Sequence, residues 1–86
     1  MLLGTVIGTA TSTVKHRSMK GFRLAVVQPV NGDRRPDGDP VLAADPLGSV
    51  PGQTVVLNSD GKAARELVGD ETSPVRYFVA GLVDGE

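Results

Sequence analysis

The pattern of small, β-branched and hydroxylated residues predicts a long first strand over Leu2–Lys15. Threonines occupy odd positions and small or apolar residues occupy even ones, so the strand has one small apolar face and one largely hydroxylated face. Gly4 and Gly8 interrupt this strand, where glycine is typical of a sharp bend or a close approach of another backbone. No helix follows them, so they do not indicate a phosphate-binding loop.

Four further strands are expected from apolar runs: Phe22–Val30, Val41–Asp45, Gln53–Leu57 and Val75–Val83. The near-continuous run Leu24–Val27 indicates burial on both faces of its strand. The last strand is apolar on both faces as well, so we expect it to pack against its own sheet and against a second surface.

Turn signals and one helix separate these strands. Asn31–Gly32 is a strong turn signal and opens a polar hairpin tip that reaches Pro40. Asn58, Ser59 and Asp60 are candidate N-caps for a short helix over Lys62–Leu67. Five strands, glycine bends and one short helix predict an all-β fold: a five-stranded barrel like the oligonucleotide/oligosaccharide-binding (OB) barrel.

The length of 86 residues predicts a single domain, 1–86, with a small core. A chain of this size buries only about 60–65% of its unfolded surface, and it has no cysteine to form a disulfide. Oligomerisation is therefore the expected source of extra burial. The start of the chain lacks a basic segment and an apolar run, so we expect no signal peptide, no membrane span and a soluble cytosolic protein.

Candidate chemistry is sparse. One histidine, His16, and scattered acids assemble no catalytic set, so we expect no catalysis, no metal site and no cofactor. Gly48–Thr54 departs from a phosphate loop in spacing and lacks its lysine, and the acids of Asp33–Asp39 depart from calcium-loop spacing. Only three aromatic residues and a net charge of −1 make nucleic-acid binding the weaker function for such a barrel.

Several segments, in order, resemble the bacterial microcompartment vertex proteins, the pentameric EutN/CcmL family. These segments are Leu3–Thr13, Leu24–Val30, Val41–Gly48, Thr54–Leu57 with Gly61 and Ala63–Arg65, Pro74–Val75 and Val79–Asp84. The resemblance implies a five-stranded barrel that forms a homopentamer and caps the corners of a polyhedral shell. It also implies a non-enzymatic role, hexameric and pseudohexameric shell proteins as partners, and a place in the microcompartment shell within the bacterial cytoplasm.

Two candidate sites follow from this hypothesis. Gly48, Ser49 and Val50 are candidates for the axial opening of the ring, because small residues let five backbones approach one another. Arg65 and Tyr77 are candidates for the subunit interface or its support. The alternative is a small OB-like binding module for nucleic acid or a partner peptide, for which neither candidate site is needed.

Overall fold

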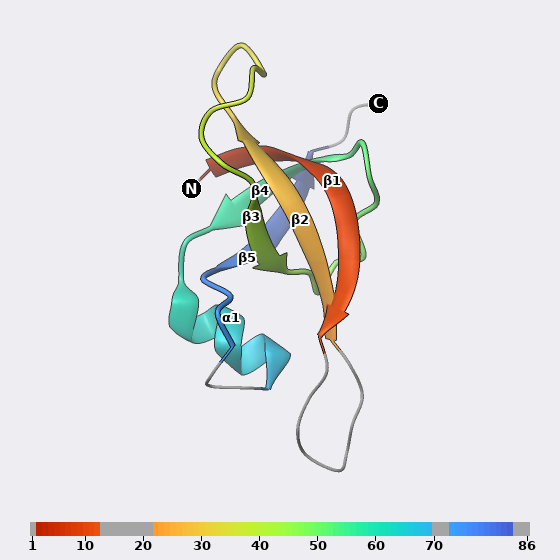
Figure 1. The fold of residues 1–86 in the computed structure, drawn as a ribbon, viewed down its shortest axis with the longest axis vertical. Helices are drawn as coiled ribbons and strands as arrows, with labels where there is room; N and C mark the ends of the chain where they lie inside the picture. Colours follow the sequence, from red (N-terminus) through yellow and green to blue (C-terminus); the bar gives the residue numbers. More distant parts are fainter. Residues whose placement is uncertain (1, 13–21, 70–72, 84–86) are drawn as a thin grey trace.

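Five strands and one helix make up the computed structural model, which describes residues 2–12, 22–69 and 73–83 (Figure 1). In chain order they are β1 (Leu2–Ser12), β2 (Phe22–Val30), β3 (Val41–Ala44), β4 (Thr54–Asn58), α1 (Gly61–Val68) and β5 (Tyr77–Val83). The order and type of the elements confirm the expected five-stranded barrel with one short helix.

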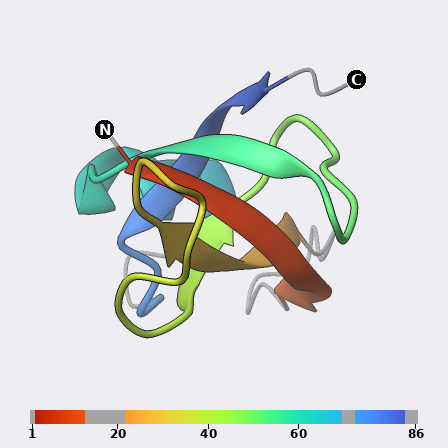
Figure 2. The ribbon, with the colours of Figure 1, turned by 90° about the horizontal axis from the view of Figure 1, so that it is seen from above.

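The strands close into a barrel in the order β1-β2-β3-β5-β4, which is seen from above in Figure 2. Four of the five strand pairs are antiparallel. The β3–β5 pair is parallel, and its register holds only Ala43 opposite Tyr77 and Ala44 opposite Phe78. This short parallel pair, the seam of the barrel, joins the two halves of the sheet.

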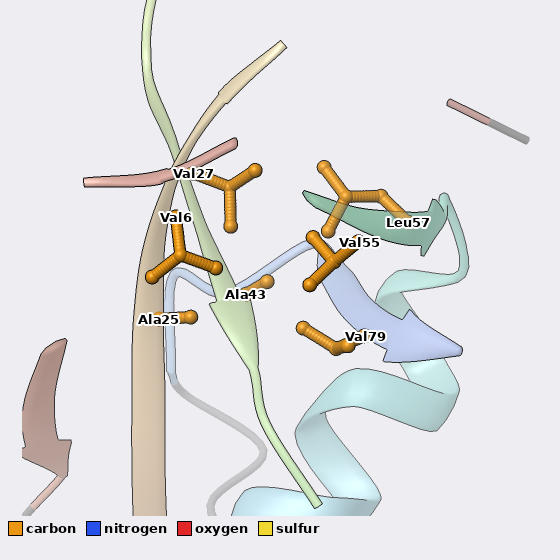
Figure 3. Close-up of a cluster of buried hydrophobic side chains, with 7 residues drawn as sticks. All are labelled: Val6, Ala25, Val27, Ala43, Val55, Leu57 and Val79. Atoms are coloured by element: carbon orange, nitrogen blue, oxygen red, sulfur yellow. The ribbon is translucent and has the colours of Figure 1, made fainter. Parts of the chain in front are cut away.

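A cluster of aliphatic side chains fills the barrel, with every strand contributing (Figure 3). It consists of Val6, Ala25, Val27, Ala43, Val55, Leu57 and Val79, each no more than 1% exposed. Burial of a valine or leucine side chain of this kind stabilises a fold by about 1.5–3 kcal/mol. Gly4 belongs to this packing, because a Cβ there would collide with Cγ1 of Val27. The expected close approach at Gly4 is therefore confirmed.

A second cluster lies between the sheet and helix α1. Leu24 and Ala44 pack there with Ala64 and Val68 of the helix and with Val75. Since Ala25 and Val27 point into the barrel and Leu24 packs in this second cluster, the run Leu24–Val27 is buried on both faces as predicted, except that Val26 is only half-buried.

The helix is closed at both ends by local hydrogen bonds. Asp60 is the N-cap and accepts a hydrogen bond from the backbone N–H of Ala63 at 3.0 Å. Gly69 ends the helix in a left-handed conformation and donates to the carbonyl of Arg65 at 2.9 Å. These caps, with the apolar face of α1, hold the helix over the seam, where it contacts both β3 and β5.

Two irregularities shift the expected alternation of faces. In β1, Val6 pairs with Val27 and Gly8 with Val26, so Ile7 has no partner and its side chain is 53% exposed. In β5, Ala80 is skipped in the same way where the strand pairs with β4. Such β-bulges bend a strand, and the expected strict alternation was wrong beyond these points.

The strand and helix boundaries differ from prediction by one or two residues. Strand β3 ends at Ala44 instead of Asp45, β4 runs one residue later than expected, and β5 begins at Tyr77 instead of Val75. The helix is one residue longer at each end than expected. The predicted end of the first strand, residues 13–15, and His16 lie outside the described residues.

Candidate functional site

The loop that joins β3 to β4, residues 46–52, is organised by one buried carboxylate. Asp45 is 2% exposed. Its Oδ1 accepts from the backbone N–H groups of Leu47 at 3.2 Å and Gly48 at 3.1 Å. Its Oδ2 accepts from the backbone N–H and the hydroxyl of Ser49, both at 2.8 Å. Asp45 thus satisfies the backbone donors of three successive loop residues.

Arg23 of β2 ties this loop to the sheet. Its Nε donates to Asp45 Oδ2 at 3.2 Å, and its Nη2 donates to the carbonyl of Ser49 at 2.6 Å. The carboxylate is fully buried, whereas 43% of the Arg23 side chain remains exposed. The ion pair therefore compensates a buried charge with a cation that stays in contact with water.

The far end of the loop is anchored to β1 and β4. Gly52 donates to the carbonyl of Val6 at 2.8 Å, and Val6 donates to the carbonyl of Gln53 at 2.9 Å. The side-chain carbonyl of Gln53 accepts from the backbone N–H of Val50 at 3.1 Å. Both ends of the loop are therefore fixed, even though Gly48 and Gly52 adopt left-handed conformations.

The three candidate residues for an axial opening are contiguous here but do not point the same way. Gly48 and Val50 lie at the surface, and Val50 is 53% exposed. Ser49 is fully buried, because its hydroxyl turns inward to Asp45. Sequence analysis missed Asp45, which it took as the end of a strand. The available signal was an aspartate directly before a proline-, glycine- and serine-containing loop, an arrangement typical of Asx turns.

Arg65 and Tyr77, the two candidate interface residues, lie in different surroundings. Arg65 is half-buried on α1, and its guanidinium lies beside Gly61, as does the side chain of Arg76. A Cβ on Gly61 would sit 2.9 Å from Nη1 of Arg65 and 3.0 Å from Cδ of Arg76. Tyr77 instead packs, half-buried, against the cluster inside the barrel.

The outer wall of the barrel carries almost no charge. Among all residues of the five strands, Arg23 alone is charged, and it is engaged with Asp45. Several large apolar side chains are nevertheless exposed on the strands: Leu2, Leu3, Ile7 and Leu82. Depletion of charge together with exposed aliphatic side chains is characteristic of surfaces that other protein chains cover.

Neither a cluster of metal-ligating side chains nor a membrane-spanning helix occurs in the described part of the chain. Within residues 2–12, 22–69 and 73–83, no three His, Cys, Asp or Glu side chains gather where they could bind a metal ion. None of the helices in these ranges has the length and apolar character needed to cross a membrane.

Comparisons with known proteins agree with this structure. Residues 1–84 match the model of a family described as ethanolamine utilisation protein EutN/carboxysome. The bacterial microcompartment shell vertex protein GrpN of Rhodospirillum rubrum is 38% identical, over 98% of this chain and 93% of its own. The carboxysome shell vertex protein CcmL of Gloeobacter violaceus is 34% identical, over 98% of this chain and 83% of its own.

Solved structures give the same result. The GrpN pentameric microcompartment shell protein from Rhodospirillum rubrum superposes with a TM-score of 0.72 at 36% identity, covering 99% of this chain and 94% of that one. The structure of Gloeobacter violaceus CcmL superposes with a TM-score of 0.73 at 34% identity, covering 100% of this chain and 88% of that one. With a family match over nearly the whole sequence and the same barrel in its relatives, the chain belongs to the EutN/CcmL family.

Proposed function

We propose that this chain is a structural shell protein that forms a homopentamer and caps the vertices of a bacterial microcompartment. Relatives over almost the full chain are named as shell vertex proteins, and a structural neighbour is a pentameric shell protein. The single observation from the molecule itself that supports this function is the nearly charge-free outer wall of the barrel.

The wall supports assembly for a physical reason. A barrel has no free sheet edge, so its chain cannot associate by adding strands and must use side chains on its outer face. Charged side chains on that face would have to lose water in an interface. Among the described residues, every charged side chain except Arg23 lies outside the five strands. Contacts between two different patches of identical subunits close into a ring when the rotation between neighbours permits it.

We further propose shell partners, a non-catalytic role and two sites on the subunit. A layer of hexagonal tiles requires pentagons to close, so hexameric and pseudohexameric shell proteins are the expected partners, in the bacterial cytoplasm. We expect no catalysis, because relatives are named for a structural role. The surface residues Gly48 and Val50 are proposed to line the axial opening with the backbone of Ser49, and Arg65 and Tyr77 to support the subunit interface.

Assembly is tested with one charge placed on the wall and one placed in a loop. Val56 alternates with the inward residues Val55 and Leu57, so a Val56→Lys change puts an ammonium on the outer face of β4. Gly32→Lys is the matched control, because no heavy atom lies within 4 Å of a Cβ at that exposed position. Native mass spectrometry at micromolar chain concentration should give five-chain rings for wild type and Gly32→Lys, and mostly monomers for Val56→Lys.

The vertex role needs a test in the shell. Cognate shell tiles are co-expressed with the wild-type chain, with Val56→Lys or with no chain, and leakage and particle images are compared. We expect closed particles with five-fold density at the corners only with the wild-type chain. Particles that close equally well without it would rule out the vertex role, and a wild-type monomer would rule out the ring.

A further inference from the structure

The β3–β4 loop is held in its conformation by hydrogen bonds within its own chain. A seven-residue loop with two left-handed glycines has many accessible conformations in isolation. Here the carboxylate of Asp45 holds the N–H groups of Leu47, Gly48 and Ser49. Nothing in this network depends on another chain, so the loop is ordered in the single subunit.

The ordered loop presents two apolar side chains to the outside. Leu47 is 47% exposed and Val50 is 53% exposed, on either side of the buried Ser49. The inward turn of Ser49 makes its neighbours in the loop point outward. No charged residue occurs from Pro46 to Ser59, so the chain runs from these two side chains into β4 without a charge. The half-exposed, charged Arg23 nevertheless contacts the loop, because it donates to the carbonyl of Ser49.

We propose that Asp45 is a positioning residue for ring assembly, and that the loop it shapes packs Leu47 and Val50 against a second copy of this chain. This inference rests on the proposed pentamer. A second copy is the occupant that fits, because the loop leads without a charge into β4 and every copy carries the same wall, in which Arg23 is the one charged residue of the five strands. Since the loop is ordered on folding, association does not bear the entropy cost of ordering it.

Asp45 can act in two ways, by stabilising the barrel alone or by positioning the loop for contact with a neighbour. If Asp45 only stabilised the barrel, weakening its network would lower the thermal stability and leave ring contacts otherwise unchanged. If it positions the loop, weakening the network and removing an apolar contact of the loop act on the same interaction. Two changes that act on one interaction are not additive, which a double-mutant cycle detects.

The cycle uses Val50→Ser, which removes the contact, and Arg23→Met, which weakens the network from the half-exposed side while keeping an apolar stem. Pro40→Ser is the control for Val50→Ser, because Pro40 is exposed in the charged loop 31–40, which has no part in the proposed interface. The charged loop and the β3–β4 loop are separate segments in Figure 1. The barrel in Figure 2 shows the same two loops from above. Arg35→Met, in an exposed loop, is the control for Arg23→Met.

Ring dissociation is followed by native mass spectrometry over a dilution series, with circular dichroism to verify the barrel. We expect Val50→Ser to raise the chain concentration needed for half-assembly at least tenfold and Arg23→Met to raise it several-fold. The double variant should match Val50→Ser alone, and both controls should match wild type.

The outcomes distinguish the inference from the proposed function. If wild type forms no pentamer, the proposed function fails. If wild type is pentameric and Val50→Ser assembles like Pro40→Ser, the loop does not contact a neighbour and the inference alone is overturned. If the effects of Val50→Ser and Arg23→Met multiply in the double variant, Asp45 does not position the loop and its assigned role is wrong.

Discussion

The loops that follow β2 and β3 both use one side chain to bind unpaired backbone N–H groups, but this side chain is exposed in the first loop and buried in the second. Each contains backbone donors that no strand pairs, and each satisfies some of them with the oxygen of one side chain. In residues 31–40 that side chain is Asn31, whose Oδ1 accepts hydrogen bonds from the backbone N–H groups of Asp33 at 2.8 Å and Arg35 at 3.1 Å. In residues 46–52 it is Asp45 of the preceding turn, which is buried.

The two loops also differ in charge. All ten residues from Asn31 to Pro40 are exposed, and five of them are charged. Residues 46–52 carry no charge. Asn31 accepts two hydrogen bonds from its loop and Asp45 accepts four. Burial adds to this difference, because water replaces a lost acceptor at the surface and cannot do so in the interior.

We expect the largest loss of unfolding free energy from a substitution that removes the buried carboxylate of Asp45. Asp45→Ala leaves loop donors without an acceptor and should lower the free energy of unfolding by about 3 kcal/mol. Asn31→Ala should lower it by less than about 1 kcal/mol, since water reaches its donors. Urea denaturation at one fixed chain concentration measures both, because assembly makes stability depend on concentration. Equal losses would show that burial does not separate the two loops.

We expect an intermediate effect from substitutions at two glycines that both have a positive φ, one in each loop. Gly38 and Gly48 have φ values of +91° and +73°, and no atom lies within 4 Å of an added Cβ at either position. Alanine at each should cost about 1 kcal/mol of unfolding free energy through backbone strain alone. Only Gly48→Ala should also weaken ring assembly in the dilution series. Weakened assembly in Gly38→Ala would instead assign the neighbour contact to the charged loop.

The smallest effect has the opposite sign. Arg34 is the non-glycine residue with a positive φ, +62°, among those that the structure describes. Arg34→Gly relieves that strain but makes the unfolded chain more flexible, so we expect a gain of about 0.5 kcal/mol in unfolding free energy. Thermal unfolding should show a small rise in Tm with unchanged assembly. A fall in Tm would mean that the arginine side chain stabilises the loop.

The elements could be predicted from sequence because each follows from local chemistry. The buried run Leu24–Val27 and the cap at Asp60 act within a few residues of themselves, so their signals survive in the bare sequence. The strand count and the barrel followed from these signals. Boundaries shifted where a tertiary contact intervened, as when the carboxylate of Asp45 turns back to the loop and ends β3.

The rest depends on contacts between distant segments. The bulge at Ile7 adjoins Gly8, one of the two glycines that indicated a bend or a close approach in the first strand, but the sequence did not show that it would change the alternation of faces. The bulge at Ala80 was not expected from the sequence. Ser49 looked like a small residue suited to an opening, and only its distance to Asp45 reveals that it points inward. The turn at Asn31–Gly32 was expected from its dipeptide, but the residues of that loop with positive φ are Arg34 and Gly38.

The seam of the barrel has a consequence for the order of folding. Strand β5 inserts between β3 and β4, so the antiparallel pairs of β1 with β2 and β4, and of β2 with β3, can form before it arrives. The parallel contacts of Ala43 and Ala44 with β5, like the pairs of β4 with β5, need the last of the five strands in chain order, so they form only after the other strands have been made. During synthesis, the sheet therefore stays open until residues 77–83 leave the ribosome, and the outer wall acquires its final curvature only then. The wall that we propose for ring assembly is therefore complete only after the last strand is in place, and until then the edges of β3 and β4 stay unpaired.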